Sequence, residues 1–560
     1  MDVGLRLILT LLCTTAALSL GRTSAANEPP ERWLERARAA GVATSLSWHR
    51  VMHYRPDLAG GVQSEVDGRS FFLSERGKTS PQRELEASLD AFTAPQDPAS
   101  PDDHARCRFP ARYAVLDDHL HWDAELPEVR CPALNTFISE IRPEVAGLVY
   151  AGASVQHPAS SVGHTFLAIG PRAGFATAIA GKHAVEYTVE EPGDNPVVYV
   201  VKGLSGGYDG VFRVLPFADK IDEYGREDNR DMWQYELTLS PAQARRVALH
   251  LWELEHTTID YFYLTENCSH HMLTLLEGAV PSLELTAKTK TMVLPIDTIK
   301  ALGPELVRSV RMFPSKHRQR LEGIAPGSDV GADHPAMGHG PLRARFGVGG
   351  TSGGRRFATM GLRLAMHDWL DPVRGHADLV QVQLMDTVLR IDLETARPSF
   401  ESVTFGEMMT LRPINRFEQA LSWRVRAIGF RVHDVGCPDG DCFVHGLNGG
   451  VGAAVATPSR TLTLFGLAEG WTLFGTDLEG IEGVPVRLGL GPRLGSRLRL
   501  GDVSLMIGGH VAFLPGQNPG FVYAGTSELR APLSTNVALG LQTRLEPGAI
   551  DGVLWSFLYF

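Results

Sequence analysis

The chain has 560 residues and a formal net charge of −11, with 44% hydrophobic and 21% charged residues, a composition that can bury a core. The mild acidity argues against a nucleic-acid binder, because affinity for phosphate needs a dense basic surface. Only the N-terminal stretch resembles a membrane helix, which excludes a polytopic helical membrane protein. Of the 58 glycines, 32 lie in residues 342–560, so two differently built halves are expected.

The N-terminus, residues 1–26, is typical of a secretory signal peptide. Arg6 supplies a positive charge, an apolar stretch runs from Leu7 to Leu20, and small residues at 23–26 offer a cleavage site. The apolar stretch is short for a bilayer span, which needs about 20 residues, and an uncleaved anchor is the alternative. Export would permit disulfides in the rest of the chain.

Two regions precede the glycine-rich half. Residues 30–100 predict a small, mostly helical N-terminal module that ends in a Pro-rich segment. In residues 105–324, short apolar runs of strand length are mixed with helical patterns, which predicts an α+β domain. We expect strands at 147–150, 165–169, 197–201 and 235–239, and helices at 242–254 and 268–276, with Gly278 beyond the end of the second helix.

Residues 325–341 are a linker by composition, and residues 342–560 follow with a strand pattern. Turn clusters divide this half into strand-length segments, of which we count about twelve. In residues 421–427 the odd positions are apolar and the even ones polar, and Phe560 ends the chain after an alternating strand. These features predict an antiparallel β-barrel of about 12 strands in the bacterial outer membrane. A soluble β-sandwich or barrel is the alternative, because it shares the alternation.

The six cysteines leave one thiol without a partner. Besides Cys13 in the signal peptide, two pairs lie close enough in the chain to be joined, although sequence alone does not fix the connectivity. The predicted disulfides are Cys107–Cys131 and Cys437–Cys442. Cys268 remains, and an odd cysteine in an exported protein is either a buried inert thiol or a reactive one.

Two segments carry candidate chemistry. His164 enters a short apolar strand after a Ser-Ser-Val-Gly turn, and Asn267 can cap the helix that begins at Cys268. Unpaired N–H groups and the helix dipole at that position lower the pKa of a thiol, and a nearby imidazole could shuttle its proton. A cysteine on a helix and a histidine on the sheet beneath it are the arrangement of papain-like thiol enzymes, here in the permuted order.

The pair Ser-Ser-Val-Gly-His-Thr-Phe-Leu and Asn-Cys-Ser-His-His resembles the Lnb N-terminal periplasmic domain family. The resemblance covers about 30–320 and implies a permuted, papain-like fold of the NlpC type, commonly followed by a barrel-type extension. It implies Cys268 as the nucleophile and His164 as the base. No motif fixes the third, orienting group. Candidates for it or for a supporting role are His183, Glu253, Asn267, His270 and Ser161.

The resemblance also implies a lipoprotein N-acyltransferase-like enzyme, held in the periplasm by the outer-membrane barrel, with a lipid or lipoprotein acyl substrate. Two other functions stay open: a cell-wall amidase or peptidase of the NlpC type, and an envelope barrel protein whose papain-like domain is inactive. A metal site is disfavoured, because the Cys-x-His-His spacing fits no structural zinc pattern. Its ligands would be His157, His164, Cys268, His270 and His271. We therefore predict no metal, no cofactor and no nucleic-acid partner.

Overall fold

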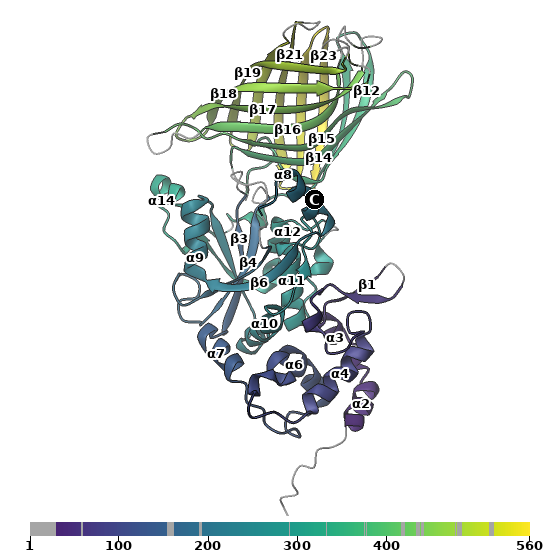
Figure 1. Cartoon of the computed structure of the whole chain (residues 1–560). Helices are drawn as coiled ribbons and strands as arrows, with labels where there is room; N and C mark the ends of the chain where they lie inside the picture. Colours follow the sequence, from purple (N-terminus) through teal and green to yellow (C-terminus); the bar gives the residue numbers. More distant parts are fainter. Residues whose placement is uncertain are drawn as a thin grey trace, which may run out of the picture.

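The computed structural model divides into three parts along its length, with helices at one end, a mixed domain in the middle and a barrel at the other end (Figure 1). The described residues are 30–57, 60–153, 162–189, 193–289, 292–331, 333–374, 376, 378–415, 421–432, 437, 442–476, 478, 484–514 and 520–560. The predicted signal peptide, 1–26, lies outside them. Among these residues no helix is long and apolar enough to cross a bilayer.

The N-terminal part is a set of short helices with one small hairpin. Its helices are α2 (Pro30–Ala39), α3 (Leu46–Val51), α4 (Pro81–Thr93), α5 (Ala105–Arg108), α6 (Pro110–Leu120) and α7 (Pro132–Ile141), and its strands are β1 (Tyr54–Pro56) and β2 (Val62–Ser64). Helix α4 is capped by Ser80, whose side chain accepts a hydrogen bond from the Arg83 N–H. A disulfide joins Cys107 in α5 to Cys131, directly before α7.

The middle domain is built on an eight-stranded antiparallel sheet in the order β10-β9-β7-β3-β4-β5-β6-β8. Its strands are β3 (Val145–Ala151), β4 (His164–Gly170), β5 (His183–Val189), β6 (Asp209–Pro216), β7 (Met232–Leu237), β8 (Ile259–Asp260), β9 (Val307–Phe313) and β10 (Ser328–Asp329). The edge strand β10 comes from the predicted linker. Successive residues of a strand point to opposite faces of its sheet. In β4, Leu167 therefore belongs to the core on one face, with Met272, and Phe166 belongs to the core on the other face, with Phe217.

Helices cover both faces of this sheet. They are α8 (Pro196–Ser205), α9 (Phe217–Asp222), α10 (Pro241–Leu254), α11 (Cys268–Ala279), α12 (Pro295–Ala301), α13 (Gly303–Leu306) and α14 (Lys316–Glu322). The core that contains Leu167 is shared with α10, α11 and α12, whereas Phe217 of α9 lies on the opposite face. Helices and strands are thus combined as the α+β prediction required.

Two local predictions are wrong. Residues 197–201 form part of helix α8, not a strand: a short apolar run has no decisive period, and the Asn195 side chain caps the helix by accepting from the Val198 N–H at 3.1 Å. Gly278 lies inside α11 instead of beyond its end. A Cβ there would stand 2.5 Å from Nε2 of His250, so this glycine permits a close approach of helix α10.

Twelve long strands of the described chain close into an antiparallel barrel (Figure 1). They are β11 (Arg343–Thr351), β12 (Arg356–Arg363), β14 (Val380–Asp392), β15 (Pro398–Thr410), β16 (Ser422–Val432), β17 (Cys442–Ala456), β18 (Leu462–Phe474), β19 (Val486–Leu500), β20 (Val503–Phe513), β21 (Phe521–Ser534), β22 (Val537–Glu546) and β23 (Ala549–Tyr559). Closure occurs where β12 pairs with both β11 and β14. A short strand, β13 (Ala365–His367), adds to β14 at one rim.

The barrel is apolar outside and charged inside. In β16, Val425 is 57% exposed while the neighbouring Arg424 is 5% exposed. Strand β22 repeats the pattern, with Leu539 and Leu541 on the outer surface. A barrel surrounded by water would have the opposite polarity, whereas an outer-membrane barrel presents apolar side chains to lipid. The predicted membrane barrel is confirmed, and the soluble alternative is wrong.

Both ends of the barrel segment lie at the rim that faces the middle domain. Leu342 and Phe560 exchange two backbone hydrogen bonds of 3.1 and 3.0 Å there. From this rim the strands run up and down, so the connection between β16 and β17 lies at the far rim. That connection holds the disulfide between Cys437 and Cys442. The near rim therefore faces the middle domain, and the far rim carries the disulfide-closed connection.

Candidate functional site

The N-terminus of α11 is fixed by Asn267. Its Oδ1 accepts from the backbone N–H groups of Ser269, at 2.9 Å, and His270, at 3.2 Å. Its Nδ2 donates to the carbonyl oxygens of Tyr263 and Val293, which ties the cap to two neighbouring segments. Cys268 consequently occupies the first turn of the helix, as the capping pattern predicted.

Among the described residues, Cys268 is the cysteine that forms no disulfide, and it is 5% exposed. Its sulfur lies 4.0 Å from the Ser269 hydroxyl oxygen, and the Thr165 backbone and the Tyr261 hydroxyl are its other polar neighbours. The Cys268 N–H in turn points at the Tyr261 oxygen, 3.4 Å away. A hydrogen bond of 3.1 Å between Thr165 Oγ1 and Ser269 Oγ holds β4 against the start of α11.

His164 is the first residue of β4 and directly precedes Thr165. Its Nε2 is buried and has no hydrogen-bond partner in the described part of the chain. The ring lies beside Tyr224, with 5.9 Å between the ring centroids. His164 and Cys268 thus lie on adjoining elements, but the imidazole is on the side of β4 that carries Phe166, whereas the Thr165 side chain faces α11. Within the described residues, Nε2 of His164 makes no hydrogen bond to the sulfur.

Burial keeps both groups uncharged. It raises the pKa of the Cys268 thiol, and the hydrogen bonds that reach the sulfur only partly offset this effect. Burial lowers the pKa of His164 to about 4, although the Glu186 carboxylate acts in the opposite direction. At neutral pH the cysteine thus holds its proton, and the neutral His164 imidazole has one ring nitrogen with a lone pair that can accept a proton.

Two candidates for the third group lie elsewhere. His183 pairs with Ile169, five residues along β4 from His164, which corresponds to about 16 Å of strand. Glu253 is occupied by the fully buried Arg112, whose N–H and Nε donate to it at 2.9 and 3.1 Å. The structure therefore places neither residue beside Cys268.

His270 faces the N-terminal module. Its Nε2 lies 2.8 Å from Oε1 of Glu65, a residue that follows β2. Burial alone would raise the pKa of Glu65, but the adjacent His270 imidazole outweighs it and holds this pKa well below the usual range. His271 is fully buried, and its ring lies 4.4 Å from that of Tyr187. Two other residues named from the sequence, His157 and Ser161, lie outside the described residues.

Sequence reasoning missed four residues around the two reactive groups. Thr165 and Ser269 directly follow His164 and Cys268, so adjacency was a usable signal. Tyr224 was not recognisable, because only the fold brings it to His164. Tyr261, seven residues before Cys268, was interpreted as a core residue. The pKa of Tyr261 is raised well above its usual range, first by burial and then by the neighbouring Cys268.

Comparison with family models gives three matches. Residues 134–305 match the model described as the Lnb N-terminal periplasmic domain. Residues 332–548 match a domain of unknown function (DUF7840), and residues 40–119 match another (DUF7843). The resemblance inferred from the two motifs is thereby confirmed for the middle of the chain. None of the curated proteins compared matches the chain.

Solved structures similar to this chain are barrels. The KdgM porin matches with a TM-score of 0.24 and 6% identity over 39% of this chain and 99% of its own. The NanC porin matches with a TM-score of 0.26 and 8% identity over the same shares. TM-scores this low support no conclusion. The assignment to the outer membrane rests on the polarity of the barrel surface. The chain joins a periplasmic domain that matches the Lnb family to a twelve-strand barrel of the outer-membrane type.

Proposed function

We propose that this protein is a periplasmic thiol enzyme that transfers an acyl group from a membrane lipid by way of Cys268. The observation that carries the proposal is the position of the thiol. It lies in the first turn of a capped helix, and the next residue of that turn, Ser269, is hydrogen-bonded to Thr165, which follows His164. The match to the Lnb periplasmic domain supports the same chemistry.

The reaction begins with proton transfer from the Cys268 sulfur to Nε2 of His164. Because the two atoms are not hydrogen-bonded at rest, substrate binding has to bring them together, as is common in unliganded thiol enzymes. The sulfur then attacks the ester carbonyl of the lipid and forms the S–C bond. The Cys268 N–H and the Tyr261 hydroxyl are placed to donate to the developing oxyanion.

Collapse of the tetrahedral intermediate breaks the bond between the carbonyl carbon and the ester oxygen. His164 returns its proton to that oxygen, the lysolipid leaves, and a thioester remains on Cys268. An amine then attacks the thioester carbonyl while His164 accepts the amine proton. The amide product departs, and the proton returns to sulfur. Transfer to water instead of an amine would make the protein a hydrolase.

Helix α8 supports a lipid as the donor. It exposes Val201 and Leu204, which are 59% and 53% exposed, and it lies at the rim of the barrel that faces the middle domain (Figure 1). The Tyr263 N–H donates to the carbonyl of Gly203, at 2.8 Å. Helix α8 therefore packs on the segment that leads to Cys268, and its apolar side is level with the membrane edge.

The proposal is tested with purified full-length protein in detergent, a phospholipid with a fluorescent acyl chain and an amine acceptor. Wild-type protein should release lysolipid and form the amide. Cys268→Ala and His164→Ala should each lose at least about 100-fold of this rate, as expected for a nucleophile and its base. His183→Gln is the matched control and should keep full activity. Equal rates in all four proteins would overturn the proposal.

A second comparison tests the lipid donor itself. Leu204→Asp should slow transfer from the phospholipid and leave transfer from a short-chain, water-soluble ester unchanged. Leu46→Asp is the control, because Leu46 is 55% exposed on the N-terminal part. If wild-type protein ignores phospholipid and cleaves a cell-wall stem peptide through Cys268, the amidase alternative replaces the acyltransferase.

A further inference from the structure

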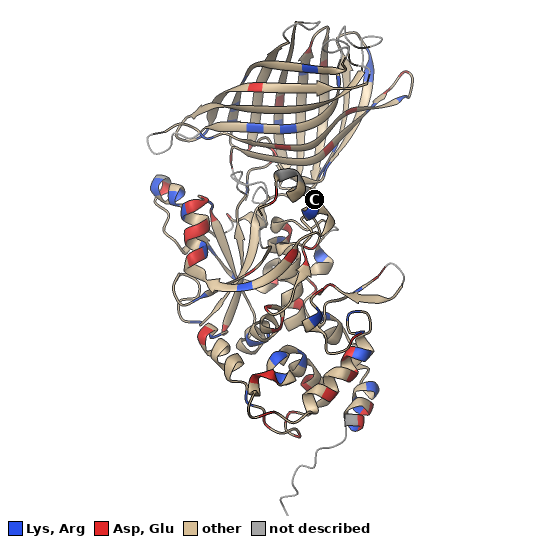
Figure 2. Ribbon diagram, in the orientation of Figure 1, with Lys and Arg blue, Asp and Glu red and all other residues tan. Residues whose placement is uncertain are grey.

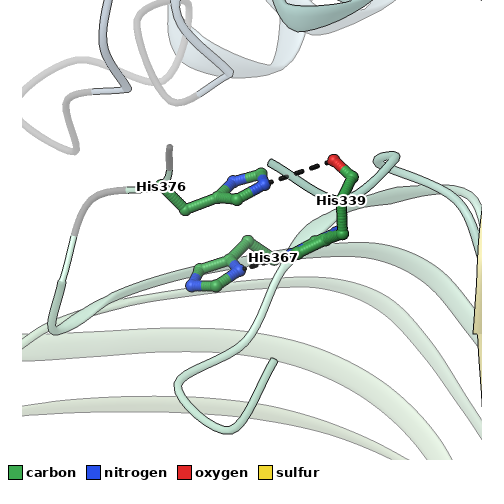
Figure 3. Close-up of side chains that lie close together, drawn as sticks. All are labelled: His339, His367 and His376. Atoms are coloured by element: carbon green, nitrogen blue, oxygen red, sulfur yellow. Dashed lines mark hydrogen bonds between the residues drawn. The ribbon is translucent and has the colours of Figure 1, made fainter. Parts of the chain in front are cut away.

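Three histidines gather at the junction of the barrel and the middle domain. Figure 3 shows the side chains of His339, His367 and His376 grouped together. One ring nitrogen of each lies within 4.8 Å of the corresponding nitrogens of the other two. His339 follows the linker, His367 ends β13, and His376 belongs to the connection between β13 and β14. The first two are buried, at 0% and 5% exposed.

In His339 and His376, the second ring nitrogen is held by a backbone carbonyl. Nδ1 of His339 lies 2.6 Å from the Gly340 oxygen, and Nε2 of His376 lies 3.4 Å from the oxygen of His339. A carbonyl oxygen only accepts, so these two nitrogens carry the protons. Nε2 of His339 and Nδ1 of His376 are left with lone pairs. Histidines that bind metals use this arrangement, with the second N–H fixed by a carbonyl or carboxylate.

The nitrogens also have nearly the right spacing. Nε2 of His339 and Nδ1 of His367 lie 3.0 Å apart. Two imidazole nitrogens bound to a tetrahedral Zn²⁺ lie about 3.3 Å apart, since each Zn–N bond is about 2.0–2.1 Å. The rings of His339 and His376 are nearly parallel, with centroids 4.0 Å apart. Parallel rings direct their lone pairs side by side, so binding an ion would require the His376 ring to turn until its lone pair converges with that of His339.

The surrounding charges are already balanced, so a cation would not meet free positive groups. Oδ2 of Asp371 lies 3.8 Å from Nδ1 of His367 and brings negative charge to the cluster. Three guanidiniums pair with the same carboxylate: Arg363 at 2.7 Å, Arg343 at 3.2 Å and Arg530 at 2.5 Å. Lys300 donates to the backbone oxygens of Ala336 and Gly338.

The backbone around His339 is packed tightly, which keeps its ring in place. A Cβ at Gly338 would stand 2.3 Å from the Arg374 oxygen, and one at Gly340 would stand 2.3 Å from the Phe560 carbonyl carbon. Only glycine fits on either side of this histidine. The Gly-His-Gly segment therefore presses the linker against both the β13–β14 connection and the chain end.

We propose that His339, His367 and His376 form a binding site for Zn²⁺ or a similar divalent cation that prefers imidazole. The fourth position is taken by water, because Asp371 is committed to Arg363. The ion would clamp the linker to the near rim and so fix the enzyme domain to the barrel. No motif in the sequence indicates this site, because its ligands are not at zinc-finger spacings.

The site is tested by Co²⁺ titration of chelator-treated, full-length protein in detergent. Wild-type protein should bind one Co²⁺ per chain, with the strong visible absorption of a tetrahedral site, and Zn²⁺ should displace it. His339→Gln and His367→Gln should each weaken binding by at least about 10-fold. His334→Gln, in the same linker, and His270→Gln, in the group with Glu65 and His271, are matched controls and should bind normally. Loss of binding in His270→Gln alone would overturn the assignment.

A second measurement covers the case in which a variant fails to fold. Wild-type protein is treated with diethyl pyrocarbonate with and without Zn²⁺, and the modified histidines are identified by mass spectrometry. Zn²⁺ should protect His376, the least buried of the three, and leave the labelling of His256 unchanged. If Zn²⁺ alters neither the Co²⁺ spectrum nor the labelling of His376, the three histidines are only a hydrogen-bonded stack and the proposal is wrong.

Discussion

The periplasmic domain and the barrel use the same strand alternation for opposite purposes. In β4 of the periplasmic domain, Phe166 and Leu167 point to opposite faces and both are completely buried. In β23 of the barrel, Leu554 is 56% exposed and Trp555 is 4% exposed. Figure 2 shows charged residues on the helices around the sheet, and on the barrel ribbons as single blue and red positions separated by uncharged ones. In the periplasmic domain both faces of the sheet are buried, whereas in the barrel only the face toward the lumen is buried.

The difference decides how each region treats a buried charge. The lumen buries Arg343, Arg363 and Arg530 near one rim and pairs them with Asp368 and Asp371. The reactive centre instead leaves Cys268 and Nε2 of His164 without an ionic partner. Paired charges stabilise a structure, while unpaired titratable groups are available for chemistry.

The largest effect is expected from breaking the charged network of the lumen. Arg530 donates to Asp368 at 2.9 Å and to Glu528 at 3.0 Å. Arg530→Leu should cost about 3–5 kcal/mol, because it leaves buried carboxylates without a cation. Urea titration of the protein in phospholipid vesicles, followed by the gel mobility of the folded barrel, measures the loss. Arg355→Leu, at an exposed turn, should change little; equal losses would mean that the lumen network contributes nothing.

A smaller effect is expected from a charge on the outer surface of the barrel. Leu541 in β22 and Leu46 in the N-terminal part are both 55% exposed. Leu541→Arg should cost about 2–4 kcal/mol of barrel stability, because the charge would face lipid near the bilayer centre. Leu46→Arg should cost less than about 0.5 kcal/mol, because it faces water. The same urea titration decides, and two equal costs would contradict the membrane location.

The periplasmic domain should lose stability in acid. Burial lowers the pKa of His164 to about 4, while an unfolded imidazole has a pKa of about 6.5. Between these values the unfolded chain binds a proton that the folded chain does not, so stability falls as the pH falls. His164→Gln should flatten this slope by up to about 1.4 kcal/mol per pH unit. Hydrogen exchange of peptides from this domain, at several pH values, measures the slope of stability against pH. His256→Gln is the control. A slope in His164→Gln equal to that of the wild-type protein would contradict the burial of His164.

The smallest effect concerns the hydrogen bond between β4 and α11. Thr165→Val removes the 3.1 Å bond to Ser269 while keeping the shape of the side chain. We expect a loss of about 0.5–1.5 kcal/mol in domain stability and a reduced acyl-transfer rate, because the start of α11 loses its support. Thr188→Val on β5 is the control. A stable domain with an unchanged rate would show that this contact does not position Cys268.

Local signals in the sequence were sufficient for part of this picture. The cap at Asn267, the strand that begins with His164 and the alternation in β16 each depend on neighbouring residues, and all three are found in the structure. Helix α8 was mistaken for a strand because Val197–Val201 has no distinguishing period. The residues that contact Cys268, His270 and Glu253 were missed for a different reason.

Those partners come from segments that only the fold brings together. Glu65 meets His270 across 205 residues of chain, and Tyr261 reaches the N–H of Cys268 through the packing of a loop. Glu253 was one of several candidates for the third group, and no motif favoured it. In the structure Arg112 occupies it, and nothing near either residue indicates this pairing.

The most direct test of the account is the mass of the acyl-enzyme. Full-length protein is incubated with a phospholipid in the absence of an amine acceptor, digested and analysed by mass spectrometry. We predict one acyl chain on the peptide that contains Cys268, released by hydroxylamine as a thioester would be and missing in Cys268→Ala. An acyl chain on another residue, or turnover of the lipid with Cys268→Ala at the wild-type rate, would contradict the account.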